Sequence, residues 1–462
     1  MKDKLGFLKI SLLLILLISL TKCNSPKTEG IKSEPHADEI KPVLINGEPR
    51  FIIGSYHNPQ DLNQLKILTD NGFNLVRSSA KKEALDMVED AGLYAWLNTG
   101  GLIDFSKDKN KRKEKLTDLV NRFKDHPALA VWEVPDEVLW ALGYPKFEFL
   151  FYGKQWSEKQ QDSILRVLSA AIPIKAQGIA DGCEQLRQID SLHPIWMNHA
   201  PRNTLSQLRL FSKSADIVGC DIYPGKKGVD GHNELHMHRM SSVGAYTDIM
   251  QNAAPGKPIW MVLQAFSWDL LRLKNPIREN LDPKEFPSYK HSRVMAWDAI
   301  LHGAKGILYW GSYMVDTKSL FWNSILGVTK EISALEPFLL EKELKDKIKI
   351  EPIQFTSSVT TRVASTLRKY NNDYLLVVLQ EDLSQSLNVS GLDFLEGKIL
   401  YELTTDRSYI VKNGKIRVWF GKEPHVLCTS KKYDVVHESQ FPLTWDKEDN
   451  FPLNEAPLRI IP

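Results

Sequence analysis

Two adjacent carboxyl side chains, Asp136 and Glu137, follow a short apolar segment that begins at residue 128. An ionised neighbour raises the pKa of a carboxyl group, so Asp136 would help Glu137 to keep its proton near neutral pH. A protonated carboxyl can act as a general acid toward a leaving group. We therefore predict that Glu137 is the leading catalytic residue. In the alternative interpretation, the pair lies at the start of the next helix, where acidic residues are favoured.

A substrate that Glu137 protonates also needs a nucleophile or a general base, and a second carboxylate can serve as either. Asp221, at the end of another apolar segment, is the first candidate. Asp136 and Glu133 follow, and Glu133 shares a strand face with Glu137 if side chains alternate with a period of two. In the alternative interpretation, Asp221 forms a structural ion pair with Arg77.

Regular elements must position these residues, and from residue 41 to about 344 short apolar runs alternate with amphipathic stretches. Near-continuous apolar runs are typical of parallel strands buried on both faces. Eight strand–helix pairs over about 300 residues close most naturally as a (β/α)8 barrel, which we assign to residues 43–344. We predict its strands at residues 51–56, 73–77, 93–98, 128–134, 195–198, 216–221, 258–264 and 305–310. Helices are predicted at residues 61–70, 81–90, 107–124, 160–190, 205–211, 234–251, 289–302 and 320–339.

In such a barrel the functional site lies at the carboxyl ends of the strands. Polar and aromatic residues follow all eight predicted strands, so they would gather at one rim once the barrel closes. From them we predict the substrate-binding residues Tyr56, Arg77, Asn98, Asn198, His199, Tyr223, Gln264, Trp268 and Trp310.

The segment HPALAVWEVPDE, from His126 to Glu137, resembles the strand-four motif of the clan A, cellulase-like glycoside hydrolases. The resemblance extends to Arg77 on strand two, to residues 221–224 (DIYP) and to residues 303–310 (GAKGILYW). It implies a glycoside hydrolase that cleaves an oligo- or polysaccharide by carboxyl acid/base catalysis, with Glu137 as the acid/base and without a cofactor.

The chain departs from this pattern on strand seven, where the clan carries its nucleophilic Glu and this sequence has Gln264. An amide is not a useful nucleophile, so two hypotheses stay open. Either the second carboxylate comes from elsewhere, or the chain is a non-catalytic glycan-binding protein on a degenerate barrel. In both cases Gln264 is expected to hydrogen-bond the sugar.

Beyond residue 345, short alternating segments separated by turns predict an all-β sandwich over residues 345–430. The strands are expected at 348–362, 374–379, 386–389, 398–403, 409–411, 415–420 and 425–429, and no structure is predicted for the tail at 431–462. The loop after strand four is rich in aromatic residues, which form either a sugar-binding platform or a packed lid: Trp140, Tyr144, Phe147, Phe149, Phe151, Tyr152 and Trp156.

The N-terminus has a positive segment, an apolar run from residue 10 to 20 and then Cys23, which resembles a lipoprotein signal. We expect lipidation of Cys23, a linker at 24–42, and a protein held by its lipid anchor at the outer membrane, cell surface or periplasm. The alternative is an ordinary secretory signal with an incidental Cys. A net charge of only +2 gives no field that would recruit nucleic acid. No Cys/His spacing suggests a metal site, and we expect a monomer.

Overall fold

The computed structural model describes residues 43–45, 47–142, 158–201, 203–224, 240–268, 286–353, 362–381 and 384–441. The predicted signal segment with Cys23, the linker at 24–42 and most of the C-terminal tail lie outside these residues. Of the aromatic loop residues only Trp140 is described, and it is partly buried; the other six lie in the segment at 143–157, outside the described part.

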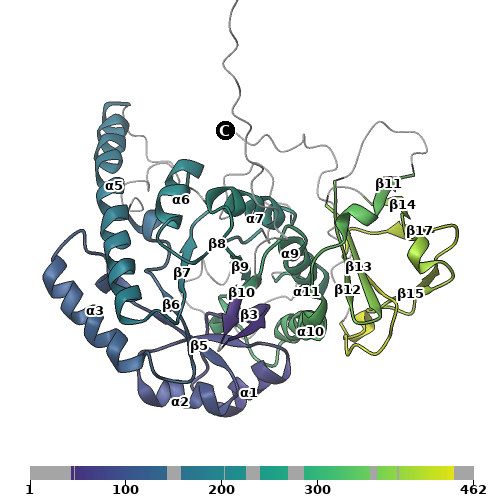
Figure 1. Cartoon of the computed structure of the whole chain (residues 1–462), viewed down its shortest axis with the longest axis horizontal. Coiled ribbons are helices and arrows are strands. Elements are labelled where there is room, and N and C mark those ends of the chain that lie inside the picture. The colour runs from purple at the N-terminus through teal and green to yellow at the C-terminus, as the bar shows by residue number, and fades with distance from the viewer. Residues whose placement is uncertain are drawn as a thin grey trace, which may run out of the picture. The chain divides into compact units, whose positions relative to one another are not determined.

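Eight parallel strands close into a barrel in the order β10-β3-β4-β5-β6-β7-β8-β9 (Figure 1). This confirms the predicted (β/α)8 fold, and each strand lies within two residues of its predicted range at either end. The strands are β3 (Ile52–Ser55), β4 (Leu75–Ser78), β5 (Tyr94–Asn98), β6 (Leu129–Glu133), β7 (Ile195–His199), β8 (Ile217–Asp221), β9 (Ile259–Gln264) and β10 (Gly306–Trp310).

Helices surround the barrel, as expected for strands buried on both faces. They are α1 (Leu62–Asp70), α2 (Lys82–Asp90), α3 (Lys109–Phe123), α5 (Glu158–Ile189), α6 (Leu205–Ser212), α7 (Ser242–Ala253), α9 (Tyr289–Leu301), α10 (Leu320–Ala334) and α11 (Glu336–Leu339). The single helix predicted at 320–339 was wrong, because Pro337 cannot continue a helix that precedes it and a new short helix starts there. Within the described ranges, no helix is both long enough and apolar enough to cross a membrane.

The barrel interior is filled by large rings. Trp96, Trp196 and Trp260 are fully buried, and the last two have ring centroids 5.2 Å apart. Gly219 on β8 makes this possible, because a Cβ there would lie 1.5 Å from the carbonyl oxygen of Trp260. A short hairpin of β1 (Val43–Ile45) and β2 (Glu48–Arg50) adds Val43 to the same cluster. The side chains at the rim therefore rest on a closely packed core.

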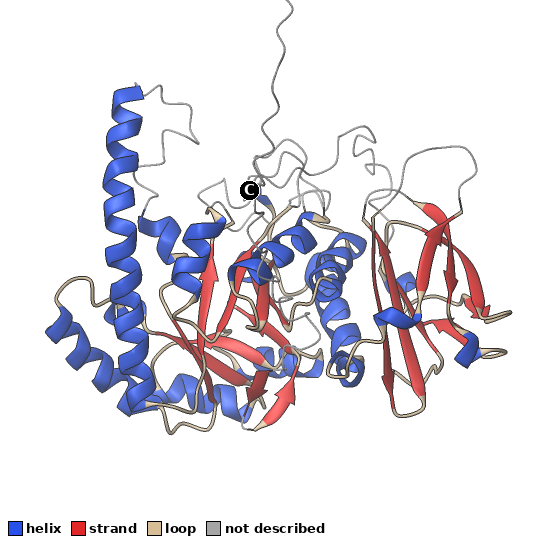
Figure 2. Cartoon of the chain, turned by 45° about the horizontal axis from the view of Figure 1, so that its top comes forward, coloured by secondary structure: helices blue, strands red, loops and turns tan. Residues whose placement is uncertain are grey.

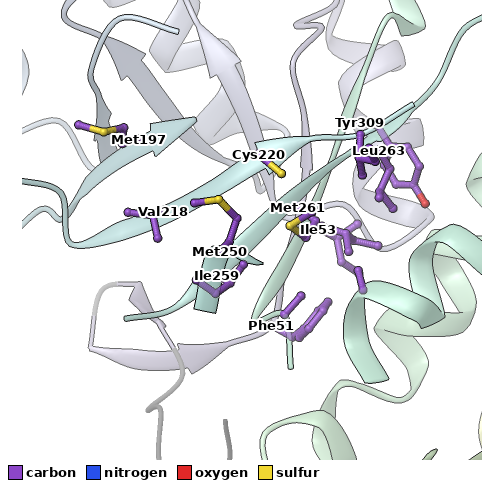
Figure 3. Packing of buried hydrophobic residues seen from close by; sticks show 14 of the residues in the cluster. Phe51, Ile53, Met197, Val218, Cys220, Met250, Ile259, Met261, Leu263 and Tyr309 are labelled. Carbon is purple, nitrogen blue, oxygen red and sulfur yellow. The ribbon is translucent and has the colours of Figure 1, made fainter. Parts of the chain in front are cut away.

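The other faces of the strands pack against the surrounding helices. Figure 3 shows Val218 of β8 and Ile259 of β9 beside Met250 of α7, and Cys220 further along β8. Cys220 is buried, as a small core residue should be. Inward and outward side chains alternate along each strand, which decides which residues can reach the site.

The C-terminal region forms two antiparallel sheets, which confirms the predicted β-sandwich (Figure 2). One sheet has the order β11-β14-β17 and the other β12-β13-β18-β15-β16. The strands are β11 (Lys349–Pro352), β12 (Val363–Tyr370), β13 (Asp373–Gln380), β14 (Gln385–Ser390), β15 (Ile399–Glu402), β16 (Ser408–Ile410), β17 (Lys415–Phe420) and β18 (His425–Cys428). The prediction missed β12, whose polar Thr366, Arg368 and Lys369 hide its alternation.

A buried ion pair lies where the sandwich packs on the barrel. Arg293 of α9 donates to both carboxylate oxygens of Glu331 on α10, at 2.7 and 2.9 Å. Trp297 donates to the same carboxylate, and Arg293 donates a third hydrogen bond to the carbonyl oxygen of Pro424, at 2.8 Å. Both charged groups thus have several hydrogen-bond partners, which is what makes a buried ion pair tolerable.

Candidate active site

The site begins with Glu133, the last residue of β6, whose side chain is fully buried. Its Oε2 accepts hydrogen bonds from Asn98 Nδ2 at 2.7 Å and Trp96 Nε1 at 3.2 Å, and lies 3.1 Å from the guanidinium of Arg77. Burial raises the pKa of Glu133 to about 8, although Arg77 opposes the shift. The guanidinium of Arg77 also lies 5.4 Å from the ring centre of Tyr56.

Glu137 follows four residues later, with a left-handed backbone at φ 45°. Its carboxyl group is hydrogen-bonded to that of Asp221 at the end of β8. Burial, and then the charges of Asp221 and Asp136, raise the pKa of Glu137 to about 10, which favours its protonated form at neutral pH. The backbone carbonyl of Glu137 also accepts from Ala141, so the residue starts a helical turn while its side chain points to Asp221.

Asn198 of β7 joins the carboxyl groups. Its Nδ2 donates to Asp136 Oδ1 at 2.8 Å and to Asp221 Oδ1 at 3.3 Å. Burial raises the pKa of Asp136, whereas the hydrogen bond from Asn198 and the charge of Arg77 lower it. The ends of β6, β7 and β8 thus bring three of the predicted residues, Asp136, Asn198 and Asp221, into direct contact around Glu137.

Three buried polar atoms around this group have no hydrogen-bond partner within the described part of the chain: Tyr56 Oη, Glu133 Oε1 and Asn198 Oδ1. Leaving such a group unpaired costs about 1–3 kcal/mol. They come from three different strand ends, yet all belong to residues within electrostatic reach of Asp136 or Asp221. A polar ligand or ordered water that enters the site would satisfy them, which is typical of a binding site.

Aromatic rings border the cluster of carboxyl side chains. Tyr223, two residues after Asp221, stacks on Trp310 at the end of β10, with centroids 5.6 Å apart and an interplanar angle of 24°. Trp268 donates from its indole nitrogen to the carbonyl of Tyr223 at 3.2 Å, and the ring of Tyr313 is exposed. The charges of Asp221, Glu137 and Asp136 all act on the Tyr223 hydroxyl, so rings and carboxyls belong to one site.

Gln264 ends β9 next to Trp310 of β10. Its side chain is fully buried, and its Nε2 donates to the carbonyl oxygen of Phe266 at 3.0 Å. The amide therefore stabilises the turn after β9. No carboxylate stands at the position where the resemblance places a nucleophile.

Two predicted substrate-binding residues have other partners. His199 follows inward-facing Asn198, so it points outward, where its Nε2 lies 3.1 Å from Ser212 of α6. It is fully buried, and burial lowers its pKa to about 4, so in the structure His199 packs between β7 and α6. Asn98 donates to Glu133 and accepts from Gly100 N–H at 2.6 Å, so it positions Glu133.

Two features of the site differ from the sequence-based expectation. The sequence left open an ion pair between Arg77 and Asp221. In the structure Arg77 instead forms its ion pair with Glu133. Trp96 was not predicted as a site residue, although its indole donates to Glu133. Alternation along β5 could have found it, since Trp96 and Asn98 lie on the same strand face.

Comparison with known proteins supports the fold. No protein-family model matches the chain, and no curated protein matches its sequence. Among solved structures, a glycoside hydrolase family 5 protein from Bacteroides vulgatus has a TM-score of 0.52 at 14% identity, over 86% of this chain and 95% of that one. A β-galactosidase from Bacillus circulans sp. alkalophilus gives 0.47 at 9% identity, over 83% and 99%.

The β-galactosidase from Rahnella sp. R3 has a TM-score of 0.46 at 13% identity, over 66% of this chain. The chain spans only 58% of that enzyme's length. These structural neighbours are glycoside hydrolases, and the likeness to the family 5 protein confirms the predicted barrel fold. At such low identities the likeness carries the fold alone.

Proposed function

We propose that the chain is a glycoside hydrolase that cleaves O-glycosidic bonds of an oligo- or polysaccharide, with Glu137 as the proton donor. The observation that carries the proposal is the hydrogen bond from the protonated Glu137 carboxyl to Asp221, beside the stacked rings of Tyr223 and Trp310. Aromatic faces suit the CH faces of sugars, and a carboxyl that stays protonated at neutral pH suits a leaving glycosidic oxygen.

The close pairing of Glu137 and Asp221 supports a division of roles between them. Carboxyls that act on opposite sides of a glycosidic bond are about 5–5.5 Å apart in retaining enzymes and about 6.5–9.5 Å apart in inverting ones. A direct hydrogen bond is shorter than both, so in this arrangement Asp221 is the group that keeps the proton on Glu137. Asp136, accessible in part and held by Asn198, is then the carboxylate that acts on the sugar or its attacking water.

Charge balance supports this division. Glu133, Asp136, Glu137 and Asp221 are four carboxyl groups, and Arg77 is the cation that acts on Glu133 and Asp136. Buried like charges cannot all ionise together, so the group retains protons at neutral pH. Burial raises the pKa of both Glu133 and Glu137, and Glu137 is the less buried of these two residues. It is therefore the residue placed to transfer its proton to a substrate.

The test is hydrolysis of a panel of aryl glycosides and oligosaccharides by the wild type, Glu137→Gln and Asp136→Asn. We expect both variants to lose cleavage while sugar binding persists in isothermal titration. Glu89→Gln, an exposed carboxyl on α2, is the matched control and should behave as the wild type. If the wild type cleaves a glycoside and Glu137→Gln cleaves it equally well, the assignment of the acid is wrong.

The second candidate function is non-catalytic glycan binding, and Gln264 is the observation that favours it. With its amide donating to Phe266 and no carboxylate on β9, the barrel lacks the nucleophile of the family it resembles. A wild type that binds an oligosaccharide but cleaves none of the panel would establish this function in place of the first.

We also propose that the protein acts outside the cytoplasm, anchored by a lipid on Cys23. The support is the sequence alone: a positive segment, an apolar run and then a Cys. In a bacterial host that processes lipoproteins, Cys23→Ala should move the protein out of the membrane fraction. A variant that stays with the membranes contradicts the anchor.

A further inference from the structure

A second cluster of ionisable groups lies away from the carboxyl ends of the strands, between helices α7 and α9 and the end of β13. It consists of Asp298 and His302 from α9 and its C-terminal cap, and Glu381 directly after β13. One ligand atom from each, a carboxylate oxygen or a ring nitrogen, lies within 4.8 Å of the other two. Asp298 is fully buried and the other two are partly buried.

The histidine is oriented by a carboxylate on its far side. His302 Nδ1 lies 2.9 Å from Asp248 of α7, and Nε2 lies 2.8 Å from Glu381 Oε1. A carboxylate on one ring nitrogen fixes the ring and makes the other nitrogen a better ligand, an arrangement common around protein-bound metals. Nε2 faces both Glu381 and Asp298, with Asp298 Oδ1 at 3.9 Å.

One buried oxygen in the cluster is unsatisfied. Asp298 Oδ2 accepts from the backbone N–H of Gly244 at 2.5 Å, but Oδ1 has no hydrogen-bond partner among the described residues. A doubly protonated His302 does not solve this, because its two N–H groups are directed to Asp248 and Glu381. A cation between Nε2, Glu381 Oε1 and Asp298 Oδ1 would satisfy all three atoms together.

The distances suit a small ion. Around a tetrahedral Zn²⁺ with bonds of about 2.0–2.1 Å, ligand atoms lie about 3.3 Å apart. The separations of Nε2 from Glu381 and Asp298, 2.8 and 3.9 Å, lie on either side of that value. An imidazole nitrogen with two carboxylates favours zinc-like ions over Ca²⁺ and Mg²⁺, which prefer oxygen alone.

Local charge also favours a cation. Asp248, Asp298 and Glu381 surround the ring, and Arg362 lies 3.2 Å from the other oxygen of Glu381.

We propose that Asp298, His302 and Glu381 form a binding site for a zinc-like divalent cation, with Asp248 as the residue that positions His302. The ion would join the barrel helices to the sandwich strand β13. This proposal is independent of the glycosidase function, because none of its residues belongs to the cluster of carboxyl side chains at the barrel rim.

The experiment is titration of the metal-stripped full chain with ZnCl2, followed by calorimetry and by the melting temperature. We expect one Zn²⁺ per chain and a melting temperature that rises with its concentration, since a ligand that binds only the native state stabilises it. Asp298→Asn and Glu381→Gln should each weaken binding at least tenfold. Asp248→Asn should weaken it by about 10–100-fold, as loss of a carboxylate behind a ligand does.

A matched control is available at the surface. Asp86, Glu89 and His126 form another cluster of three possible ligands, but Asp86 is already paired with Lys82 and Glu89 is exposed. Asp86→Asn should leave Zn²⁺ binding unchanged. Absence of stoichiometric Zn²⁺ binding to the wild type overturns the proposal, as does binding that survives Asp298→Asn and Glu381→Gln but is lost in Asp86→Asn. Preference for Ca²⁺ over Zn²⁺ would also overturn it.

Discussion

The carboxyl groups of Glu137 and Asp221 form a hydrogen bond with each other, and this contact favours a proton on Glu137. The two residues come from the ends of β6 and β8, on either side of β7, and Asn198 of β7 binds Asp221 and Asp136 from between them. Because the proton belongs to a pair, removing either partner changes what the other can do. Substitutions at Glu137 and at Asp221 should therefore have different and opposite signatures.

For catalysis, we expect Glu137→Gln to lower kcat on natural oligosaccharides by about 10²–10⁴-fold, the usual contribution of a general acid. The amide keeps the shape of the side chain but has no acidic proton. Substrates with an activated leaving group need little protonation, so their cleavage should fall less. Steady-state kinetics on both substrate types measure the difference, and an equal loss on both would count against a proton donor.

For pH dependence, activity that needs protonated Glu137 should persist into the alkaline range and fall as the pH approaches about 10. Asp221→Asn removes a negative charge that disfavours ionisation of Glu137. The pKa of Glu137 should therefore drop, and the alkaline limb of the kcat/KM profile should move to lower pH. A limb that stays in place, or moves to higher pH, contradicts the pairing.

For stability, the raised pKa of Glu137 means that the folded chain holds a proton that the unfolded chain releases above about pH 4.5. The stabilising effect of this group is full below that pH and is lost as the pH rises toward 10. Glu137→Gln cannot ionise, so its melting temperature should exceed that of the wild type by a margin that grows between pH 6 and 9. A constant margin would show that ionisation is not involved.

For the Arg77–Glu133 pair, we expect Arg77→Met to destabilise the fold by about 1–3 kcal/mol, because the buried Glu133 carboxyl loses a hydrogen-bond partner and the cation that opposes its raised pKa. Urea unfolding measures the loss. Adding Glu133→Gln to Arg77→Met removes a carboxyl that the folded chain must keep protonated, whereas the unfolded chain ionises it, so the double variant should be more stable than Arg77→Met alone. If the double variant is less stable, Arg77 acts through its packing on Tyr56 instead.

For the strand-seven position, Gln264→Glu should neither create nor increase hydrolysis. A carboxylate there would face the carbonyl oxygen of Phe266 where the amide now donates a hydrogen bond, and it would be fully buried. We expect a lower melting temperature and unchanged or reduced kcat. A gain of cleavage in Gln264→Glu would support the degenerate-barrel hypothesis.

The strands of the barrel were predictable because each is a continuous apolar run that stops at polar or aromatic residues, as β8 stops at Asp221. Alternation along a strand was equally available, and applied to β7 it would have turned His199 outward next to inward-facing Asn198. The pairing of Glu137 with Asp221 was not predictable in this way. It depends on a left-handed backbone at a residue that is not glycine, which sequence patterns do not encode.

Contacts between distant elements were also beyond the sequence. Arg77 could pair with any of four carboxyls, and only the closed barrel selects Glu133, 56 positions away by the chain numbering. Asp298 of α9 and His302 at its C-terminal cap are four residues apart, but the third residue of the set, Glu381, reaches them only when the sandwich packs on the barrel. The strand β12 was missed for a local reason, because its own polar residues interrupt the alternating apolar pattern that indicates a strand.

The hydrogen bond from Arg293 to the carbonyl of Pro424 ties the two domains at a point where neither side can easily be exposed. Removing the sandwich would expose the guanidinium of Arg293, which now donates three hydrogen bonds. The bond to the carbonyl oxygen of Pro424 would be lost, and that N–H group would bind water instead. We therefore expect the isolated barrel to be less stable than the barrel of the full chain. Heating should melt both parts in a single calorimetric transition, and any exchange of the sandwich would have to bring its own acceptor for Arg293.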